Sequence, residues 1–273
     1  MRYAATAPGK RVRPILTLAT AAMFGAEGDA VLDLACGVEL VHTCSLVLDD
    51  LPSMDDAKLR RGRRTTHLEF GEAVAVLAAF ALLNRGFALV AEASQRLPLS
   101  RYRAEDLLHH LTAAIGSDGL IGGQALDLGG SAATVRLADL EAIHSRKTGA
   151  LFVAAAELGA MSGDARRKDL EAIGSFAKNL GLAFQIEDDL VDATATSEQS
   201  GKDAHQDAGK ATFVSLLGIE GARALADELL DFAGQSLTPF GRRADELRAI
   251  AELVRDYGRL RTPPPGAAAT TAP

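Results

Sequence analysis

Apolar residues recur along most of this chain in the pattern of amphipathic and buried helices, and no stretch shows the regular Val, Ile and Thr alternation of strands. Glycine and proline divide the pattern, for example at Gly25, Pro52, Pro98 and Gly163. The pattern predicts helices over residues 13–24, 30–51, 70–95, 104–115, 137–158, 166–191, 212–217, 222–230 and 244–260. We therefore expect an all-α protein.

These helices are expected to form one domain. The chain has 273 residues, of which 48% are hydrophobic, and this is enough for a single sizeable core. No linker divides the helical pattern, and no repeat of fixed period suggests a stacked array. The final residues, TPPPGAAATTAP, are rich in Pro and Ala and lack periodicity. We predict a single domain over residues 1–261 and a disordered tail over residues 262–273.

Composition argues against several classes of function. The formal net charge is −7, only 5% of residues are aromatic and Trp is absent, so we expect no nucleic acid partner. The longest apolar run, residues 73–83, is shorter than the roughly 20 residues of a membrane span, and no membrane insertion is expected. Cys36 and Cys44 lack the spacing of zinc sites or disulfide frameworks, which favours the cytoplasm.

Charged residues gather where two of the predicted helices end. The first group consists of Asp49, Asp50, Asp55 and Asp56, and it is followed by the bases Arg60, Arg61, Arg63 and Arg64. The second is FQIEDDLVD, residues 184–192, and the bases Lys202 and Lys210 follow it. A single charge run of this kind is more often a solvated face with internal pairing. Its recurrence at a second helix end favours a functional interpretation.

The second acidic group carries like charges on one helix face. Asp188 and Asp192 lie four residues apart, with Gln185 and Asp189 close to the same face. Such charges repel without a counter-ion. Magnesium is a suitable counter-ion because it takes a few carboxylate oxygens and completes its shell with water and substrate phosphates. Two such groups around several Mg²⁺ ions predict a site that holds a diphosphate.

Proline interrupts the first acidic group. Pro52 breaks the helix, so we expect the segment LPSM to bulge and return Asp55 toward Asp49, although spacing alone leaves Asp55 and Asp56 as alternatives. His42 lies two turns before Asp49 and points to the same side. Two diphosphates carry more charge than the ions neutralise, so basic residues must balance it. The candidates are Lys10, Arg13, Arg60, Arg61, Lys147, Lys202 and Lys210.

An ordered set of eight motifs extends these observations, and the family resemblance that they carry covers roughly residues 2 to 258. They are PGKRVRP (8–14), DDLPSMDD (49–56), LRRG (59–62), FGE (70–72), GGQALDL (122–128), KTG (147–149), FQIEDDLVD (184–192) and GKDAHQDAGKAT (201–212). Together they resemble the trans-isoprenyl diphosphate synthases, or polyprenyl synthetase family, and most of all the bacterial geranylgeranyl diphosphate synthases of carotenoid pathways. The resemblance implies the isoprenoid synthase fold, a bundle of mostly antiparallel helices around a deep central cavity, and a homodimer.

The resemblance also implies roles for individual residues. Asp49, Asp55 and Asp188, helped by Asp50, Asp189 and Asp192, would ligate about three Mg²⁺ ions on the allylic diphosphate. Arg60, Lys147, Thr148, Gln185 and Lys202 would hold that substrate, with Lys210 as a further diphosphate-binding candidate. Lys10, Arg13, His42 and Arg61 would hold isopentenyl diphosphate, and Gln124 and Asp127 would lie near the cavity. Asp49, Asp55, Arg60, Lys147, Asp188 and Lys202 are the residues expected to carry catalysis.

The implied reaction is a head-to-tail condensation of isopentenyl diphosphate with an allylic diphosphate through a carbocation. Relatives that stop at C15 tend to place an aromatic ring one turn before the first aspartates, where this chain has Cys44 and Ser45. We therefore predict the C20 product geranylgeranyl diphosphate, with farnesyl diphosphate (C15) as the alternative. A class I terpene cyclase and a non-catalytic regulatory subunit are more remote alternatives.

The chain also departs from the family pattern. Pro8, Leu48 and Arg64 replace a glycine, a histidine and a proline that the family usually carries. Few residues precede Pro8, so the helix or helices that open related chains are expected to be missing here. This departure bears on stability and on dimer contacts.

Overall fold

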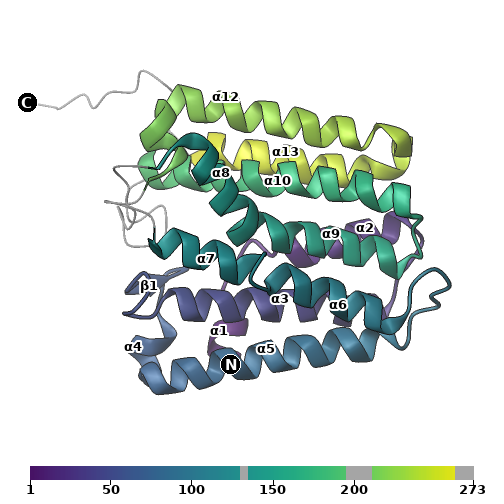
Figure 1. The fold of residues 1–273 in the computed structure, drawn as a ribbon, viewed down its shortest axis with the longest axis horizontal. Coiled ribbons are helices and arrows are strands. Elements are labelled where there is room, and N and C mark those ends of the chain that lie inside the picture. Colours follow the sequence, from purple (N-terminus) through teal and green to yellow (C-terminus); the bar gives the residue numbers. More distant parts are fainter. Residues whose placement is uncertain (130–134, 195–210, 262–273) are drawn as a thin grey trace, which may run out of the picture.

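A computed structural model describes residues 1–129, 135–194 and 211–261 of the chain. Nearly every element is a helix, and the helices lie roughly side by side along the long axis of the molecule (Figure 1). The helices before the middle of the chain are α1 (Arg2–Ala5), α2 (Val12–Met23), α3 (Asp29–Asp49), α4 (Thr66–Phe70), α5 (Glu72–Ser94), α6 (Ala104–Ile115) and α7 (Leu120–Gly129). Those that follow are α8 (Leu137–His144), the π-helix η1 (Ser145–Gly149), α9 (Ala150–Ser162), α10 (Arg167–Thr194), α12 (Phe213–Ser236), the 3₁₀-helix η2 (Thr238–Ala244) and α13 (Asp245–Arg261).

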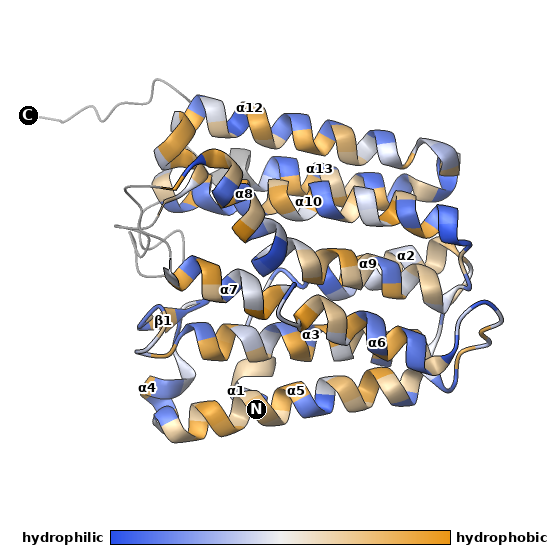
Figure 2. Ribbon diagram, viewed as in Figure 1, coloured by the Kyte–Doolittle hydropathy of each residue, from blue (hydrophilic) through white to orange (hydrophobic). Residues whose placement is uncertain are grey.

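The centre of the bundle is α9. This helix is apolar all round, as expected of a helix with no solvent-facing side. It packs against α2, α6, α10 and α3, and Phe152 on it is completely buried. Its approach to α2 is close, because a side chain on Gly159 would meet the carbonyl oxygen of Thr17 at 2.3 Å. Blue polar residues alternate with orange apolar residues along α10, α12 and α13, whereas α5 is mostly apolar (Figure 2).

Helices α3 and α5 form the most extensive helix–helix contact among the described residues, followed by α10 with α12. Both α3 and α5 are long and apolar enough to cross a membrane by length and composition. Core helices of soluble proteins pass the same test, and α3 is 56% buried over its apolar window. Helix α5 is only 33% buried there, so much of its apolar surface faces outward in the single chain.

The all-α prediction is confirmed, although several boundaries differ. The helix predicted over residues 137–158 is divided by the π-helix η1, and the two predicted over 212–217 and 222–230 form one element with a break at Gly218, whose φ is 71°. Helix α7 and a two-stranded hairpin, β1 (Leu59–Arg60) with β2 (Arg63–Arg64), lie outside the predicted elements. Helix propensity could not indicate the hairpin, because its strands are only two residues long. The tail, residues 262–273, lies outside the described residues.

Candidate functional site

One pocket of about 360 Å³ receives both acidic helix ends. Helix α3 brings Asp49 to it and α10 brings Asp188, because both helices run toward the same end of the bundle (Figure 1). Fourteen of the twenty residues predicted for the site line this pocket: Lys10, Arg13, His42, Ser45, Asp49, Asp55, Arg60, Arg61, Gln124, Lys147, Thr148, Gln185, Asp188 and Asp192. Cys44, Asp50, Asp127 and Asp189 lie beside it, while Lys202 and Lys210 fall outside the described residues.

The chain after α3 returns on itself and selects between two aspartates. The backbone N–H of Asp56 donates to the carbonyl oxygen of Leu51 at 3.0 Å, which closes the turn that contains Pro52. Asp55 lines the pocket. The side chain of Asp56 is half-exposed instead, and it accepts both of its hydrogen bonds from Lys58 at 2.8 Å. Of the two alternatives, the structure therefore brings Asp55 to the site.

Asp49 is strongly affected by this environment. Burial, together with the nearby carboxylates of Asp55 and Asp50, raises its pKa to about 6, while Lys147 and Arg60 act in the opposite direction. The negative charge of a buried carboxylate is poorly compensated when other carboxylates lie beside it. The position is therefore one where an additional cation would be stabilised.

Asp50 has a different role from that of Asp49. It is only 3% exposed, and its Oδ1 accepts hydrogen bonds from Nε and Nη2 of Arg60 at 2.9 and 2.6 Å. Burial raises the pKa of Asp50, and Arg60 opposes that shift. Asp50 thus positions Arg60 and lies outside the lining of this pocket, and the metal contact predicted for it stays a prediction.

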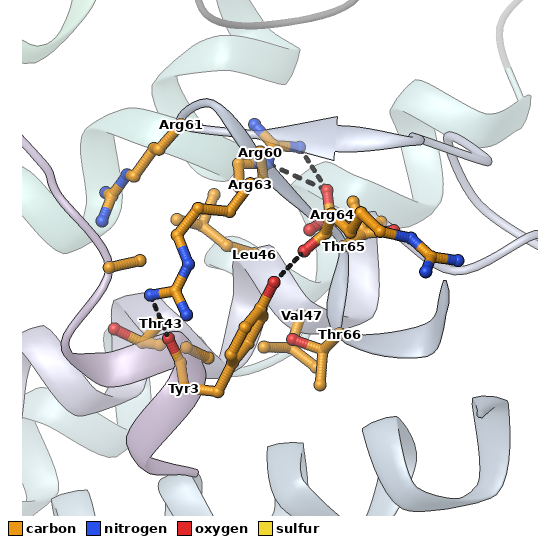
Figure 3. A pocket seen from close by; sticks show the side chains of 13 residues that line it. Tyr3, Thr43, Leu46, Val47, Arg60, Arg61, Arg63, Arg64, Thr65 and Thr66 are labelled. Atoms are coloured by element: carbon orange, nitrogen blue, oxygen red, sulfur yellow. Dashed lines mark hydrogen bonds and ion pairs between the residues drawn. The ribbon is translucent and has the colours of Figure 1, made fainter. Parts of the chain in front are cut away.

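The four arginines after the first acidic group separate because the chain turns sharply between them. Arg61 and Gly62 have φ of 55° and 74°, the left-handed pair typical of a tight hairpin, and Arg60 pairs with Arg63 across it. Arg60 and Arg61 reach the site pocket. Arg63 instead lies over the ring of Tyr3 at 3.9 Å, beside a second, neighbouring pocket (Figure 3). Arg64 is exposed, and its carbonyl oxygen accepts the hydroxyl of Tyr3 at 2.8 Å (Figure 3).

A basic wall faces the acidic ends. Arg13 lies 4.6 Å above the ring of Phe152, and burial lowers its pKa to about 10. Nη1 of Arg13 lies 3.2 Å from Nε2 of His42. Burial, and then Arg13 and Arg61, lower the pKa of His42 well below its usual range. His42 is therefore a neutral acceptor for Arg13 and adds no positive charge to this wall.

The π-helix η1 supplies two more pocket residues. Its wider turn places Lys147 and Thr148 on the wall, and such irregular turns are frequent at functional sites. Nζ of Lys147 donates to Asp127 of α7 at 2.5 Å, so Asp127 holds this lysine from beside the pocket. Gly123 permits the close approach of α7, because a Cβ there would lie 2.3 Å from the backbone nitrogen of Lys147.

A chain of hydrogen bonds orders the second acidic end. Thr148 donates to Gln185 at 3.0 Å, and Gln185 donates to Oδ1 of Asp189 at 3.0 Å. Oδ2 of Asp189 accepts the backbone N–H of Phe213, the first residue of α12, at 3.0 Å. Asp189 is buried and connects α10 to α12, so in this structure it supports the site from behind while Asp188 and Asp192 line the pocket.

The two residues predicted to limit product length are separated. Ser45 lines the pocket, one turn before Asp49, and its hydroxyl donates to the carbonyl oxygen of His42 at 2.9 Å. Cys44 is 5% exposed and packs with Ala79 and Leu82 of α5. Burial raises the pKa of its thiol to about 11. Ser45 is therefore the residue of the two that a growing chain in the pocket would meet.

Sequence reasoning missed eight pocket residues, namely Gly9, Arg11, Val12, Glu39, Leu46, Leu120, Phe184 and Tyr257. Phe184 precedes Gln185 in the second acidic motif, so its position on α10 was available as a signal. Tyr257 comes from α13, far along the chain, and no local pattern connects it to the site. Both rings contact Lys10, whose Nζ lies 2.5 Å from Oδ1 of Asp188.

Comparison with known proteins gives a consistent result. The sequence model of the polyprenyl synthetase family matches residues 1–240. Farnesyl diphosphate synthase of Escherichia coli is 43% identical over 260 residues, which are 94% of this chain and 86% of that protein. Geranylgeranyl diphosphate synthase of Pantoea ananas is 42% identical over 240 residues, 87% of this chain and 78% of that protein.

Solved structures agree with these relatives. The polyprenyl synthase of Caulobacter crescentus CB15, complexed with calcium and isoprenyl diphosphate, has a TM-score of 0.84 at 30% identity and matches 96% of this chain and 88% of its own. The geranyltransferase of Helicobacter pylori, complexed with magnesium and isoprenyl diphosphate, has a TM-score of 0.81 at 31% identity, with 93% and 86% covered.

Proposed function

Since this chain belongs to the polyprenyl synthetase family and is a head-to-tail prenyltransferase, we propose that it extends an allylic diphosphate with isopentenyl diphosphate to geranylgeranyl diphosphate (C20). One observation carries the site assignment. Carboxylates from two distant helix ends, Asp49 and Asp55 on one side and Asp188 and Asp192 on the other, line the same pocket. A basic wall with Arg13 and Arg61 completes it.

The donor set fits Mg²⁺. Carboxylate oxygens are the hard ligands this ion prefers, and the poorly compensated Asp49 and the ammonium of Lys10 beside Asp188 both mark positions that favour a cation. Among the described residues, no three His, Cys, Asp or Glu side chains come close enough to enclose an ion alone. We infer that about three ions bind together with the substrate diphosphate, whose oxygens complete their coordination.

The first substrate is the allylic diphosphate. Bound Mg²⁺ would stabilise the departing diphosphate as its bond to the allylic carbon breaks. Arg60, held by Asp50, and Lys147, held by Asp127, are proposed to bind the same diphosphate as fixed positive charges. Gln185 orders Thr148 on the pocket wall. Lys202 and Lys210 are proposed to add to this charge, although both lie outside the described residues.

The second substrate is isopentenyl diphosphate. Lys10, Arg13, His42 and Arg61 line the basic side of the pocket and are proposed to hold its diphosphate. Its double bond then attacks the allylic cation, a carbon–carbon bond forms, and loss of a proton gives a chain one C5 unit longer. The step requires positioning and charge stabilisation, and no side-chain nucleophile takes part.

Product length is the finer part of the proposal. Ser45 is small and lines the pocket one turn before Asp49, which supports room for a C20 tail. The 43% identity to a farnesyl diphosphate synthase favours C15 as the alternative. Incubating the purified protein with Mg²⁺, isopentenyl diphosphate and each of the C5, C10 and C15 primers, then measuring the product mass, tests both. A C20 product supports the proposal, a C15 product replaces its finer part, and absence of elongation contradicts it.

We propose that the protein acts as a homodimer. Val74 (49% exposed), Leu77 (68%) and Phe80 (63%) lie at helical spacing on one face of α5, and Phe70 (48%) ends α4 just before it. Exposed apolar residues gathered in this way support contact with a second copy of the chain. Size-exclusion chromatography with light scattering should give twice the chain mass. Leu77→Glu should give the monomer, and an unchanged mass for this variant would contradict the assigned surface.

We propose that the reaction takes place in the cytoplasm. Cys36 and Cys44 are both free thiols, which is consistent with a reducing environment such as the cytoplasm.

A further inference from the structure

Lys10 is enclosed by three partners that come from distant parts of the chain. Its Nζ lies 2.5 Å from Oδ1 of Asp188, 3.5 Å from the ring centre of Tyr257 and 4.5 Å from the ring centre of Phe184. Asp188 and Phe184 belong to α10, one turn apart, and Tyr257 belongs to α13. The lysine side chain is 36% exposed and Lys10 lies between α1 and α2, so neither burial nor a helix fixes this position.

The ion pair between Lys10 and Asp188 conflicts with the functions proposed for these two residues. Asp188 is proposed to ligate Mg²⁺, and Lys10 is proposed to bind the diphosphate of the second substrate. In this structure the two side chains form an ion pair with each other instead. A metal ion on Oδ1 of Asp188 would lie close to the ammonium 2.5 Å from that oxygen, and the repulsion between the two cations favours displacement of Lys10.

We propose that Tyr257 is a positioning residue that holds Lys10 on Asp188 in the ligand-free enzyme, so that metal and allylic diphosphate must displace Lys10, which then serves isopentenyl diphosphate. This inference rests on the proposed function and adds a residue of α13 to it. An aromatic face attracts an ammonium within about 6 Å, and Tyr257 is well inside that range. Since α13 packs against both α10 and α2, the ring has a fixed place from which to act.

Loss of the Tyr257 ring should change ligand affinity in opposite directions, depending on whether Tyr257 is a positioning residue or only a structural one. If Tyr257 only supported the pocket, its loss would weaken ligand binding. If it stabilises the Lys10–Asp188 pair, its loss favours displacement of Lys10 and strengthens binding of the metal-bound allylic ligand. A cation–aromatic contact at a partly exposed site corresponds to about a twofold to fivefold change in affinity.

The test is a calorimetric titration of the full chain with Mg²⁺ and a non-reactive thiolo analogue of geranyl diphosphate. Tyr257→Leu and Tyr257→Met should bind the analogue about twofold to fivefold more tightly than the unaltered protein. Tyr257→Phe keeps the ring face and should match the unaltered protein. Lys10→Met removes the ammonium, so adding Tyr257→Leu to it should change nothing further. Circular dichroism of each variant verifies folding.

Equal or weaker binding by both ring-free variants would overturn the role of Tyr257, as would the same gain from Tyr257→Leu with and without Lys10. These failures leave the proposed function intact. Failure of the unaltered protein to bind the analogue in Mg²⁺ contradicts the proposed function itself, and the role of Tyr257 with it.

Discussion

The backbone N–H of Asp55 donates a hydrogen bond to the carbonyl oxygen of Asp49 at 2.9 Å. This bond closes the turn that contains Pro52, so the two aspartates come together although five residues lie between them in the sequence. Asp56, the next residue, adopts φ of 47° and turns toward Lys58. The proline insertion therefore brings Asp55 to Asp49 and directs Asp56 toward solvent.

Replacing the two aspartates separately tests this relationship. Asp55→Asn should lower kcat in Mg²⁺ by about a hundredfold to a thousandfold, because the carboxylate helps to hold the ions that stabilise the leaving diphosphate. Asp56→Asn is the matched control and should stay within about twofold, since a half-exposed ion pair contributes little. Steady-state kinetics with saturating Mg²⁺ measures both. Similar losses in the two variants would contradict the selection of Asp55.

The pKa of Asp49 predicts an effect of pH on stability. Its value of about 6 in the folded, metal-free protein lies above the ordinary 3.8, so the folded state binds this proton more strongly than the unfolded chain does. The carboxyl group therefore costs stability progressively as pH rises from about 4 to about 6, and the full cost persists above that range. Asp49→Asn should stabilise the metal-free protein at pH 8 by about 1–3 kcal/mol while abolishing turnover.

Thermal unfolding in the presence of a chelator, from pH 5 to pH 8, measures this difference. The gain in melting temperature of Asp49→Asn should grow with pH. A variant that is less stable than the unaltered protein at pH 8, or a gain that is independent of pH, would be inconsistent with a buried carboxylate whose charge is poorly compensated.

Product length separates the contributions of Ser45 and Cys44. Ser45→Phe should shift the main product from C20 to C15, because the ring enters the pocket that the growing tail needs. Cys44→Tyr should instead destabilise the protein by about 1–3 kcal/mol, since Cys44 is buried against α5 and the added ring has no room there. Mass analysis of products and thermal unfolding distinguish the two effects. A shortened product from a fully stable Cys44→Tyr would place the limit of the channel at α5.

The contact between α7 and the π-helix is tested by glycine substitutions. Gly123→Ala should lower kcat by about tenfold to a hundredfold, because its Cβ would lie 2.7 Å from Cα of Lys147 and displace that lysine from the pocket. Gly129→Ala, on the same helix, is the control, as no atom of the described residues, apart from its chain neighbours and its own helix, lies within 4 Å of its added carbon. Circular dichroism verifies that both variants fold. Equal activity of the two would show that Lys147 does not need this close approach.

Much of the bundle follows from the sequence because its signals are local. Residues 104–115 form α6 with the bounds that the apolar pattern predicts, and the ends of α2, α3 and α10 differ by one to three residues. The two acidic helix ends were also visible as clusters. Helix propensity failed where long-range contacts decide, as at the π-helix, whose Lys147 is placed by its packing against Gly123.

The site residues show the same difference between what local sequence predicts and what long-range contacts decide. Sequence spacing identified the aspartates but could not show which of them face the pocket, because Asp50 and Asp189 are turned away by Arg60 and by the start of α12. Those partners lie 10 and 24 residues distant in sequence. Tyr257 is the extreme case, since only the packing of α13 against α10 and α2 brings it to Lys10.

The central claim is that both acidic helix ends bind one allylic diphosphate through shared Mg²⁺. The most direct test is the affinity of the non-reactive thiolo analogue of geranyl diphosphate for Asp49→Asn and Asp188→Asn, with Mg²⁺ and with a chelator. The account predicts that each substitution alone removes the Mg²⁺-dependent part of the binding. Retention of the full Mg²⁺-dependent affinity by either variant would show that the two clusters do not act on one ligand.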